Sequence, residues 1–322
     1  MSQISVEGMS LYATVEKEIP LDGYYLLKSC QAGSWYPSIE VSLRYVLAQI
    51  GANFIDDPRQ STCIGCANHI GVIPFLPIVT LNARNISLAS QSGMRNVICN
   101  CPTCYSNLKE CKGILDGSSA MKDRAMSAMR TAGLAYNNSV SINHVSEAFL
   151  ANIERIKEKA RYSLHGLRAV THHGCHYSKV YYKEVASGNF ERPTVLDRIL
   201  EGFGCQVVDY PERSLCCGLG FHHIMLGPNY TRAVTRRKYA GMMEADPDLI
   251  VTMCAGCTLS LDMCQEKLLQ ELGEERDIPV LNISELLALL LGADPHRVAG
   301  IDMHGVPVEP LLDKIGIPRV RA

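Results

Sequence analysis

The feature that most constrains this chain is a widely spaced set of cysteines that occurs twice. The set in the second half comprises Cys175, the adjacent pair Cys216-Cys217, and Cys254-Ala-Gly-Cys257. The set in the first half comprises Cys30, Cys63 and Cys101-Pro-Thr-Cys104. The chain has 14 cysteines among 322 residues, which is unusually many for a cytosolic enzyme and too dispersed for a disulfide-stapled mini-domain. Any fold of this chain must therefore gather distant thiols twice.

The two halves correspond beyond these cysteines. Cys101 and Cys254 are separated by 153 residues, and Arg84 and Arg237 share that separation. Similarity over such a length indicates a duplicated domain rather than a solenoid of short repeats. A chain of 322 residues has room for two ordinary domains, which we place at residues 1–166 and 167–322. The cysteine array of the second domain is complete, with an adjacent pair of cysteines, and the array of the first domain is modified, because it has a single cysteine in place of this pair.

Each half repeats one order of short apolar strands and amphipathic helices. Strands are expected at residues 24–27, 53–55, 96–99 and from 142, and again at 168–170, 206–209, 249–253 and from 280. Ser146 and Ser284 are the expected N-caps of the helices that follow the last strand of each half. This alternation predicts two α/β domains with mostly parallel sheets. Ligands gather at the carboxyl ends of such strands, where the cysteines fall, so each array should converge in space.

Composition and charge exclude several classes of protein. The chain is 47% hydrophobic and 20% charged, and its net charge of −2 argues against a nucleic-acid binder. The longest apolar run, residues 286–291, is far shorter than the roughly 20 residues that span a bilayer. The polar, acidic start lacks the basic and apolar segments of a signal peptide. We therefore expect a cytoplasmic protein without a membrane span, whose cysteines serve metals or catalysis.

The second array favours an iron–sulfur cluster over zinc. Soft thiolates at long intervals are typical of iron–sulfur clusters. Five cysteines exceed the four ligands of a regular four-iron cluster, and the adjacent pair Cys216-Cys217 suits two different irons. Zinc takes four ligands, often as two close pairs, which leaves the fifth sulfur unexplained. A zinc-stabilised scaffold without chemistry is kept as an alternative.

The first array departs from this pattern. Aligning Cys63 with Cys217 puts Thr62 where the second half has Cys216. The four remaining thiolates suit a regular cubane [4Fe–4S] cluster, held by Cys30, Cys63, Cys101 and Cys104. Either Cys66 or Cys99 could restore a fifth ligand, although Cys99 equally suits a small buried hydrophobic position.

The second array, read together with Gly218 after the adjacent pair, resembles the cysteine-rich CCG domain. This domain occurs twice in the B subunit of heterodisulfide reductase and in its relatives, and the resemblance covers nearly the whole chain. It implies a noncubane [4Fe–4S] cluster and a disulfide that is cleaved between the two domains. By this resemblance, the ligands of the noncubane cluster are Cys175, Cys216, Cys217, Cys254 and Cys257.

Histidines and a basic run are further candidates for function. His176 follows Cys175, and His222 and His223 follow the adjacent cysteine pair. We regard these three as candidate catalytic residues, since a departing thiolate needs a proton or a nearby positive charge. They could equally hydrogen-bond cluster sulfides and tune the potential. The basic residues between 232 and 238 are typical of the solvated side of a helix, with attraction of an anionic thiol or carrier protein as the alternative.

With these features, the resemblance implies an oxidoreductase acting on sulfur groups, as the catalytic iron–sulfur subunit of a heterodisulfide-reductase-like complex. The resemblance implies a ferredoxin-like iron–sulfur subunit and a flavin-containing subunit as partners. Thr62 favours the type found in sulfur oxidisers, with a thiol or disulfide substrate carried by a protein, while reduction of the methanogen CoM–CoB heterodisulfide stays open. A further alternative is an electron-relay subunit of a hydroxy-acid oxidase, but such chains usually carry an extra ferredoxin-like segment that is absent here.

Overall fold

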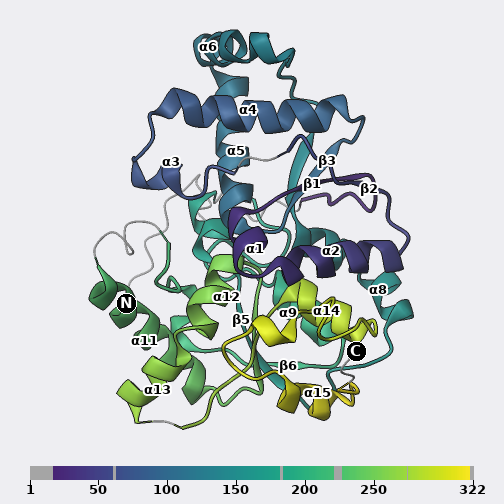
Figure 1. Cartoon of the computed structure of the whole chain (residues 1–322), viewed down its shortest axis with the longest axis vertical. Coiled ribbons are helices and arrows are strands. Elements are labelled where there is room, and N and C mark those ends of the chain that lie inside the picture. Colours follow the sequence, from purple (N-terminus) through teal and green to yellow (C-terminus); the bar gives the residue numbers. More distant parts are fainter. Residues whose placement is uncertain (1–16, 61–62, 182–183, 221–226, 274, 320–322) are drawn as a thin grey trace, which may run out of the picture.

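The computed structural model describes residues 17–60, 63–181, 184–220, 227–273 and 275–319. The first half of the chain occupies the upper part of the molecule in Figure 1 and the second half the lower part. The strands of the two halves form separate sheets, which confirms the predicted α/β class with two parallel sheets. The domain boundary at residues 166 and 167 stays a prediction.

The first half is built on a four-stranded parallel sheet with strand order β2-β1-β3-β4. Its strands are β1 (Tyr24–Leu27), β2 (Phe54–Ile55), β3 (Asn96–Cys99) and β4 (Ser141–His144). Its helices are α1 (Cys30–Ser34), α2 (Pro37–Gln49), α3 (Ala67–Ile70), α4 (Phe75–Gln91), α5 (Pro102–Gly117), α6 (Ser119–Met129), α7 (Val145–Ala151) and α8 (Ile153–Lys159), with a 3-10 turn η1 (Arg130–Ala132).

The second half repeats this arrangement with strand order β6-β5-β7-β8, again all parallel. Its strands are β5 (Arg168–His172), β6 (Gln206–Val207), β7 (Leu249–Thr252) and β8 (Val280–Asn282). Its helices are α9 (Val195–Gly202), α11 (Pro228–Glu244), α12 (Ala255–Asp262), α13 (Gln265–Leu272), α14 (Ile283–Leu290) and α15 (Glu309–Ile315). Shorter turns are the π-helical η2 (His176–Val180) and the 3-10 turns η3 (Pro211–Ser214) and η4 (Ile301–Met303).

The central strands are short and apolar because helices cover both faces of a parallel sheet. All residues of β1 and β7 are buried, and helices such as α14 are buried along their whole length. None of the helices within the described ranges is long and apolar enough to cross a membrane.

The two halves pack against each other through two matching contacts. Helix α1, which begins at Cys30, contacts α12, which follows Cys254; η2, which follows Cys175, contacts α5, which follows Cys101. The first cysteine segment of each half therefore packs on the Cys-x-x-Cys helix of the other half. Helices α2 and α14 also pack together and extend this interface.

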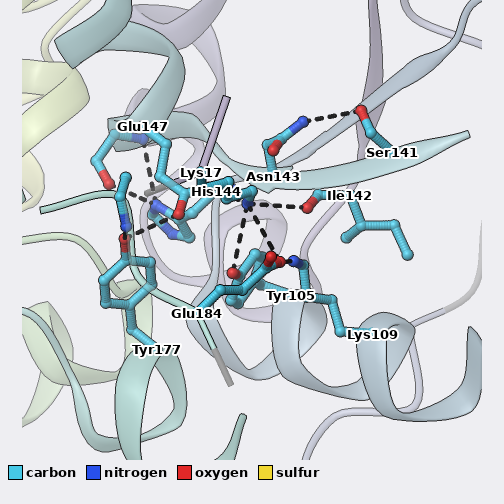
Figure 2. A network of polar contacts seen from close by, with 12 residues as sticks. Lys17, Tyr105, Lys109, Ser141, Ile142, Asn143, His144, Glu147, Tyr177 and Glu184 are labelled. Carbon is cyan, nitrogen blue, oxygen red and sulfur yellow. Dashed lines mark hydrogen bonds and ion pairs between the residues drawn. The ribbon is translucent and has the colours of Figure 1, made fainter. Parts of the chain in front are cut away.

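A buried carboxylate fixes each side of the interface. Glu147 accepts hydrogen bonds from Lys17 Nζ at 2.8 Å and from Tyr177 of the second half at 2.9 Å (Figure 2). On the other side, Glu285 accepts a hydrogen bond from Ser38 Oγ of the first half at 2.6 Å. Both carboxylates are completely buried, so each needs these donors.

The same two glutamates complete capping boxes that differ from the prediction. The N-caps are His144 and Asn282, whose side chains accept from the backbone N–H of residues 146 and 284. The predicted N-caps Ser146 and Ser284 are therefore wrong, and these serines lie in the first helical turn. The last residue of each strand serves as the cap because Glu147 and Glu285 at position N3 bond back to its N–H.

Candidate iron–sulfur site

The strand ends set the positions of the first members of each array. In the first sheet Leu27, Cys99 and His144 lie at the same level, at the carboxyl ends of three neighbouring strands. Cys30 and Cys101 follow two of these ends within three residues. Parallel strands thus place both cysteines at one edge, as predicted.

Each Cys-x-x-Cys segment opens a helix. Cys101 is the N-cap of α5 with φ −143° and ψ 126°, and Cys254 is the N-cap of α12 with φ −128° and ψ 123°. This extended backbone turns the chain so that Cys104 and Cys257 fall in the first helical turn. The first N–H groups of the helix and the positive end of its dipole then point to the same space, which favours thiolates or an anionic cluster.

Both arrays open into one cavity between the two halves. Its volume is about 240 Å³, and ten cysteines line it, five from each half. They are Cys30, Cys63, Cys66, Cys101, Cys104, Cys175, Cys216, Cys217, Cys254 and Cys257. Every cysteine named as a ligand of either predicted cluster is among them, whereas Cys99 is fully buried in β3 and does not line the cavity. The cysteine spacing alone predicted two metal centres. The family resemblance added that a disulfide is cleaved between the two domains, and this indicated a space shared by both centres.

The thiols of the first half are in mutual contact. The sulfurs of Cys63 and Cys104 are 3.2 Å apart, and the backbone N–H of Gly65 donates to Cys63 Sγ at 3.2 Å. Contacts with the Cys104 and Cys30 thiols hold the pKa of Cys63 well below its usual range. The pKa of Cys104 is raised, first by its contacts with Cys101 and Cys63 and then by burial. These thiols therefore share protons that a metal would replace.

The second half holds its adjacent cysteine pair through the backbone. The carbonyl of Cys217 accepts hydrogen bonds from Thr235 Oγ1 at 2.8 Å and Ser260 Oγ at 2.7 Å. Gly218 follows with φ 97°, and a Cβ at this position would collide with Thr235 Oγ1 and lie 2.8 Å from the carbonyl of Thr231. A glycine is needed here because the chain turns closely over α11.

The two arrays adjoin at Gly174. A Cβ on this residue would lie 3.6 Å from Cys257 Sγ and from the Cβ of Cys254, and 3.6 Å from Pro102 Cγ of the other half. The Cys101 thiol also interacts with Cys254, which lowers the pKa of Cys101 together with the larger effect of Cys104. A group bound by one array is thus close to a group bound by the other.

The structure places one of the three predicted catalytic histidines. His176 lines the cavity, and its Nδ1 is 3.5 Å from Cys175 Sγ. Burial lowers its pKa to about 4, and its ring centroid lies 4.9 Å from that of His69. His222 and His223 lie outside the described residues, so their role stays a prediction.

His172 joins the site more closely than its sequence position indicated. It is 2% exposed, and one ring nitrogen and the sulfurs of Cys217 and Cys257 all lie within 4.8 Å of one another. Neither ring nitrogen has a hydrogen-bond partner among the described residues. An unsatisfied buried imidazole is costly, so a group that binds beside these sulfurs would satisfy it. Its place as the last residue of a buried strand before the first cysteine is the signal in the sequence.

The interpretation of the basic run as a solvated face is wrong for one residue. Arg232, Arg236 and Arg237 are exposed and lie near Glu271 and Glu212, but Lys238 is completely buried. Residues 235, 238, 239 and 242 of α11 are all buried, at a spacing of three or four residues. That helical period was the available signal, and the neighbouring arginines obscured it.

The donor set fits iron–sulfur clusters. Ten soft thiols surround one small cavity, helix N-termini point into it, and a buried histidine beside it lacks a partner among the residues that the structure covers. Zinc sites commonly use four ligands, so this number of sulfurs exceeds what one zinc ion would hold.

Comparison with known proteins agrees with this site. Residues 24–109 and 169–262 each match the cysteine-rich domain family named CCG. The chain is 34% identical over 310 residues to the B subunit of ferredoxin:CoB-CoM heterodisulfide reductase of Methanosarcina acetivorans, covering 94% of this chain and 98% of that protein. It is 30% identical to a protein of Archaeoglobus profundus that is named as similar to the same subunit, covering 86% and 93%.

Two further matches are more distant, one in sequence and one in structure. The membrane anchor subunit of 8-methylmenaquinol:fumarate reductase of Wolinella succinogenes is 28% identical over 75% of this chain and 82% of that protein. A solved structure of a hypothetical protein from Helicobacter pylori has the same fold with a TM-score of 0.65 and 15% identity, covering 88% of this chain and 53% of that one. Two CCG domains and the match along nearly the whole chain together show that this protein belongs to the family of heterodisulfide reductase B subunits, whose cysteine-rich domains fit iron–sulfur redox chemistry.

Proposed function

We propose that this protein carries out thiol and disulfide redox chemistry in the cavity between its two halves, as the catalytic iron–sulfur subunit of a heterodisulfide-reductase-like complex. The observation that supports this most is the opening of both cysteine arrays into one cavity. A disulfide has two sulfur atoms, and a cavity with a thiolate array on each side offers one array to each sulfur.

In this proposal the second array holds a noncubane [4Fe–4S] cluster and the first a cubane one. When bound, such clusters take up and release single electrons and bind a substrate sulfur, which thiol exchange alone does not do. Cys66 also lies on the cavity wall, so a fifth sulfur of the first half is within reach of the site. Substitution of Cys66 decides between four and five ligands, as described below.

His176 would manage protons in this cavity. Burial keeps its ring neutral because it lowers the pKa, and a neutral imidazole has one N–H that can be donated to sulfur. Its position beside Cys175 puts this donor next to the second array. His222 and His223 are proposed for the same role from their sequence positions.

Partners and direction of electron flow extend this proposal. The name of the Methanosarcina relative pairs ferredoxin with the CoB-CoM heterodisulfide. We propose a ferredoxin-like iron–sulfur subunit and a flavin-containing subunit as partners. Thr62 favours oxidation of a carrier-bound sulfur, whereas the name of the Methanosarcina relative favours reduction of a heterodisulfide. Co-purification of a carrier protein would support oxidation, and co-purification of a ferredoxin-like subunit would support reduction.

Metal analysis of protein purified without oxygen tests the proposal. Several irons and acid-labile sulfides per chain are expected, and stoichiometric zinc without iron would overturn it. For the cluster types, we compare Cys216→Ser and Cys66→Ser with Cys205→Ser, since Cys205 is buried away from the cavity.

The three variants have distinct expected outcomes. Cys216→Ser should change the EPR signal of oxidised, thiol-treated protein, and an unchanged signal contradicts the noncubane cluster. Cys66→Ser should retain its iron if the first cluster is a cubane with four ligands, and loss of iron there contradicts that assignment. Cys205→Ser should match the unchanged protein in both measurements.

A further inference from the structure

Among the residues that the structure describes, Lys238 is a buried cation without a carboxylate partner. It lies on α11 with 0% exposure, and its Nζ donates to the backbone carbonyls of Glu212 at 2.9 Å and Arg213 at 3.1 Å. The ring of Tyr210 lies 5.0 Å from the same nitrogen. Within the described ranges, no carboxylate oxygen comes within 4.0 Å of it. A lysine is rarely buried in this way unless a negative charge compensates it.

Other deeply placed cations near the two arrays are paired. Lys17 contacts Glu147, and Lys109 contacts Glu184 (Figure 2). Arg213, beside Lys238, is paired with Asp197. Lys238 differs from these three cations because no described carboxylate neutralises it.

The negative groups near Lys238 are the thiolates of the second array. Burial lowers the pKa of Lys238 to about 8, and the charges of Cys217, Cys257, Cys216 and Cys175 act in the opposite direction. The same face of α11 carries Thr235, which holds the carbonyl of Cys217. The carbonyls bound by Lys238 belong to η3, just before the adjacent cysteine pair. One helix face thus positions both the pair and the charge.

The duplicated half has no such charge at the matching position. The separation of 153 residues that relates Arg84 to Arg237 places Asn85 at the position of Lys238. Asn85 lies on α4 and is 4% exposed, so the position is buried in both halves. The two halves therefore differ in charge at this equivalent buried position.

We propose that Lys238 is the counter-charge of the second iron–sulfur site and makes this site easier to reduce than it would be without that charge. The inference rests on the proposed function, because it requires a cluster at each array. Added electrons increase the negative charge of a site, and a fixed positive charge shielded from water stabilises the reduced form. Lys238 is a positioning and tuning residue, since it acts through the cluster and need not contact substrate.

The test is a redox titration of the whole chain, followed by EPR, after iron and sulfide have been measured. Lys238→Met removes the charge and keeps the length of the side chain, and Lys238→Gln keeps a hydrogen-bond donor if the first variant does not fold. Arg236→Gln is the matched control, on the exposed face of the same helix. Cys104→Ser and Cys257→Ser assign the signals to the two sites.

Loss of the charge should shift the midpoint potential of the second site to a more negative value and leave the first site unchanged. The control should shift neither. Equal shifts at both sites, or no shift in an iron-loaded variant, would overturn the role of Lys238 while leaving the proposed function intact. Absence of iron and sulfide in the unchanged protein would instead overturn the proposed function and this inference with it.

Discussion

The buried ion pairs around His304 yield a prediction with a definite sign. His304 lies between two carboxylates of the second half, with Nδ1 3.3 Å from Asp262 and Nε2 3.6 Å from Glu285, and all three side chains are fully buried. The first half contributes Tyr36, whose hydroxyl donates to Asp262 at 2.7 Å, and Ser38, which donates to Glu285. Removing His304 would leave two buried carboxylates without this cation.

The pKa of His304 gives the size of the effect. Burial lowers this pKa, but Asp262 and Glu285 outweigh burial and raise it to about 10 from the usual 6.5. At about 1.4 kcal/mol for each pKa unit, the difference corresponds to at most about 5 kcal/mol of stability. This agrees with the range of about 3–5 kcal/mol for breaking a buried ion pair.

The raised pKa determines how stability depends on pH. The contribution is complete below pH 6.5, where the histidine is charged in both folded and unfolded protein. It declines as the pH rises towards 10, because only the folded state still holds the proton in that interval. At a pH of about 7.5, about 3 kcal/mol should remain.

His304→Gln is compared with the unchanged protein by denaturant unfolding, without metal, under reducing conditions, between about pH 6 and about pH 9.5. The variant should lose about 3–5 kcal/mol near pH 6, and the difference should shrink steadily as the pH rises. Cysteine ionisation affects both proteins alike and cancels in the difference. His296→Gln is the control, since His296 pairs with the exposed Asp302 and should cost under about 1 kcal/mol at every pH. A large loss that does not vary with pH would refute the reasoning.

Further predictions concern the cavity itself. Gly218→Ala should lower the free energy of unfolding by about 1–3 kcal/mol and reduce iron retention at the second array, because its Cβ would collide with Thr235. Gly113→Ala on α5 is the control, since its Cβ meets nothing within 4 Å and the change should be neutral or slightly stabilising. Urea midpoints and iron content check both variants. His172→Phe should leave the metal-free protein at least as stable as the unchanged protein, because an apolar ring replaces a buried imidazole that has no hydrogen-bond partner in the described structure. The same variant should lose iron to a chelator faster. Unchanged iron release, or a large loss of stability in the metal-free form, would contradict this role.

Much of the fold could be predicted from the sequence because each element has a local cause. The strand at residues 24–27 was expected as a short apolar run and is observed with these bounds. The expected alternation of strands and helices is also observed after β3 and β7, where the Cys-x-x-Cys segments open α5 and α12. In both cases the pattern and the structure depend on the same few neighbouring residues.

The composition of the shared cavity could not be predicted from spacing because it depends on contacts between distant residues. The packing of α1 on α12 and of η2 on α5 pairs segments from opposite halves of the chain. No periodicity within either half encodes this exchange. Lys238 was misinterpreted for a related reason, since its burial depends on the segment around Glu212 that covers it, while its neighbours in sequence are exposed arginines.

Duplication explains why the interface between the two halves has two similar sides, but the cation on each side is different. Glu147 and Glu285 occupy equivalent capping positions, and each accepts a hydrogen bond from the opposite half, from Tyr177 and Ser38 respectively. Their cations are unrelated: Lys17 precedes the first sheet, whereas His304 follows the second. The stabilisation that His304 provides declines above about pH 6.5, because above that pH only the folded protein still holds the proton. Alkaline pH should therefore weaken the side of the interface at which His304 pairs with Glu285.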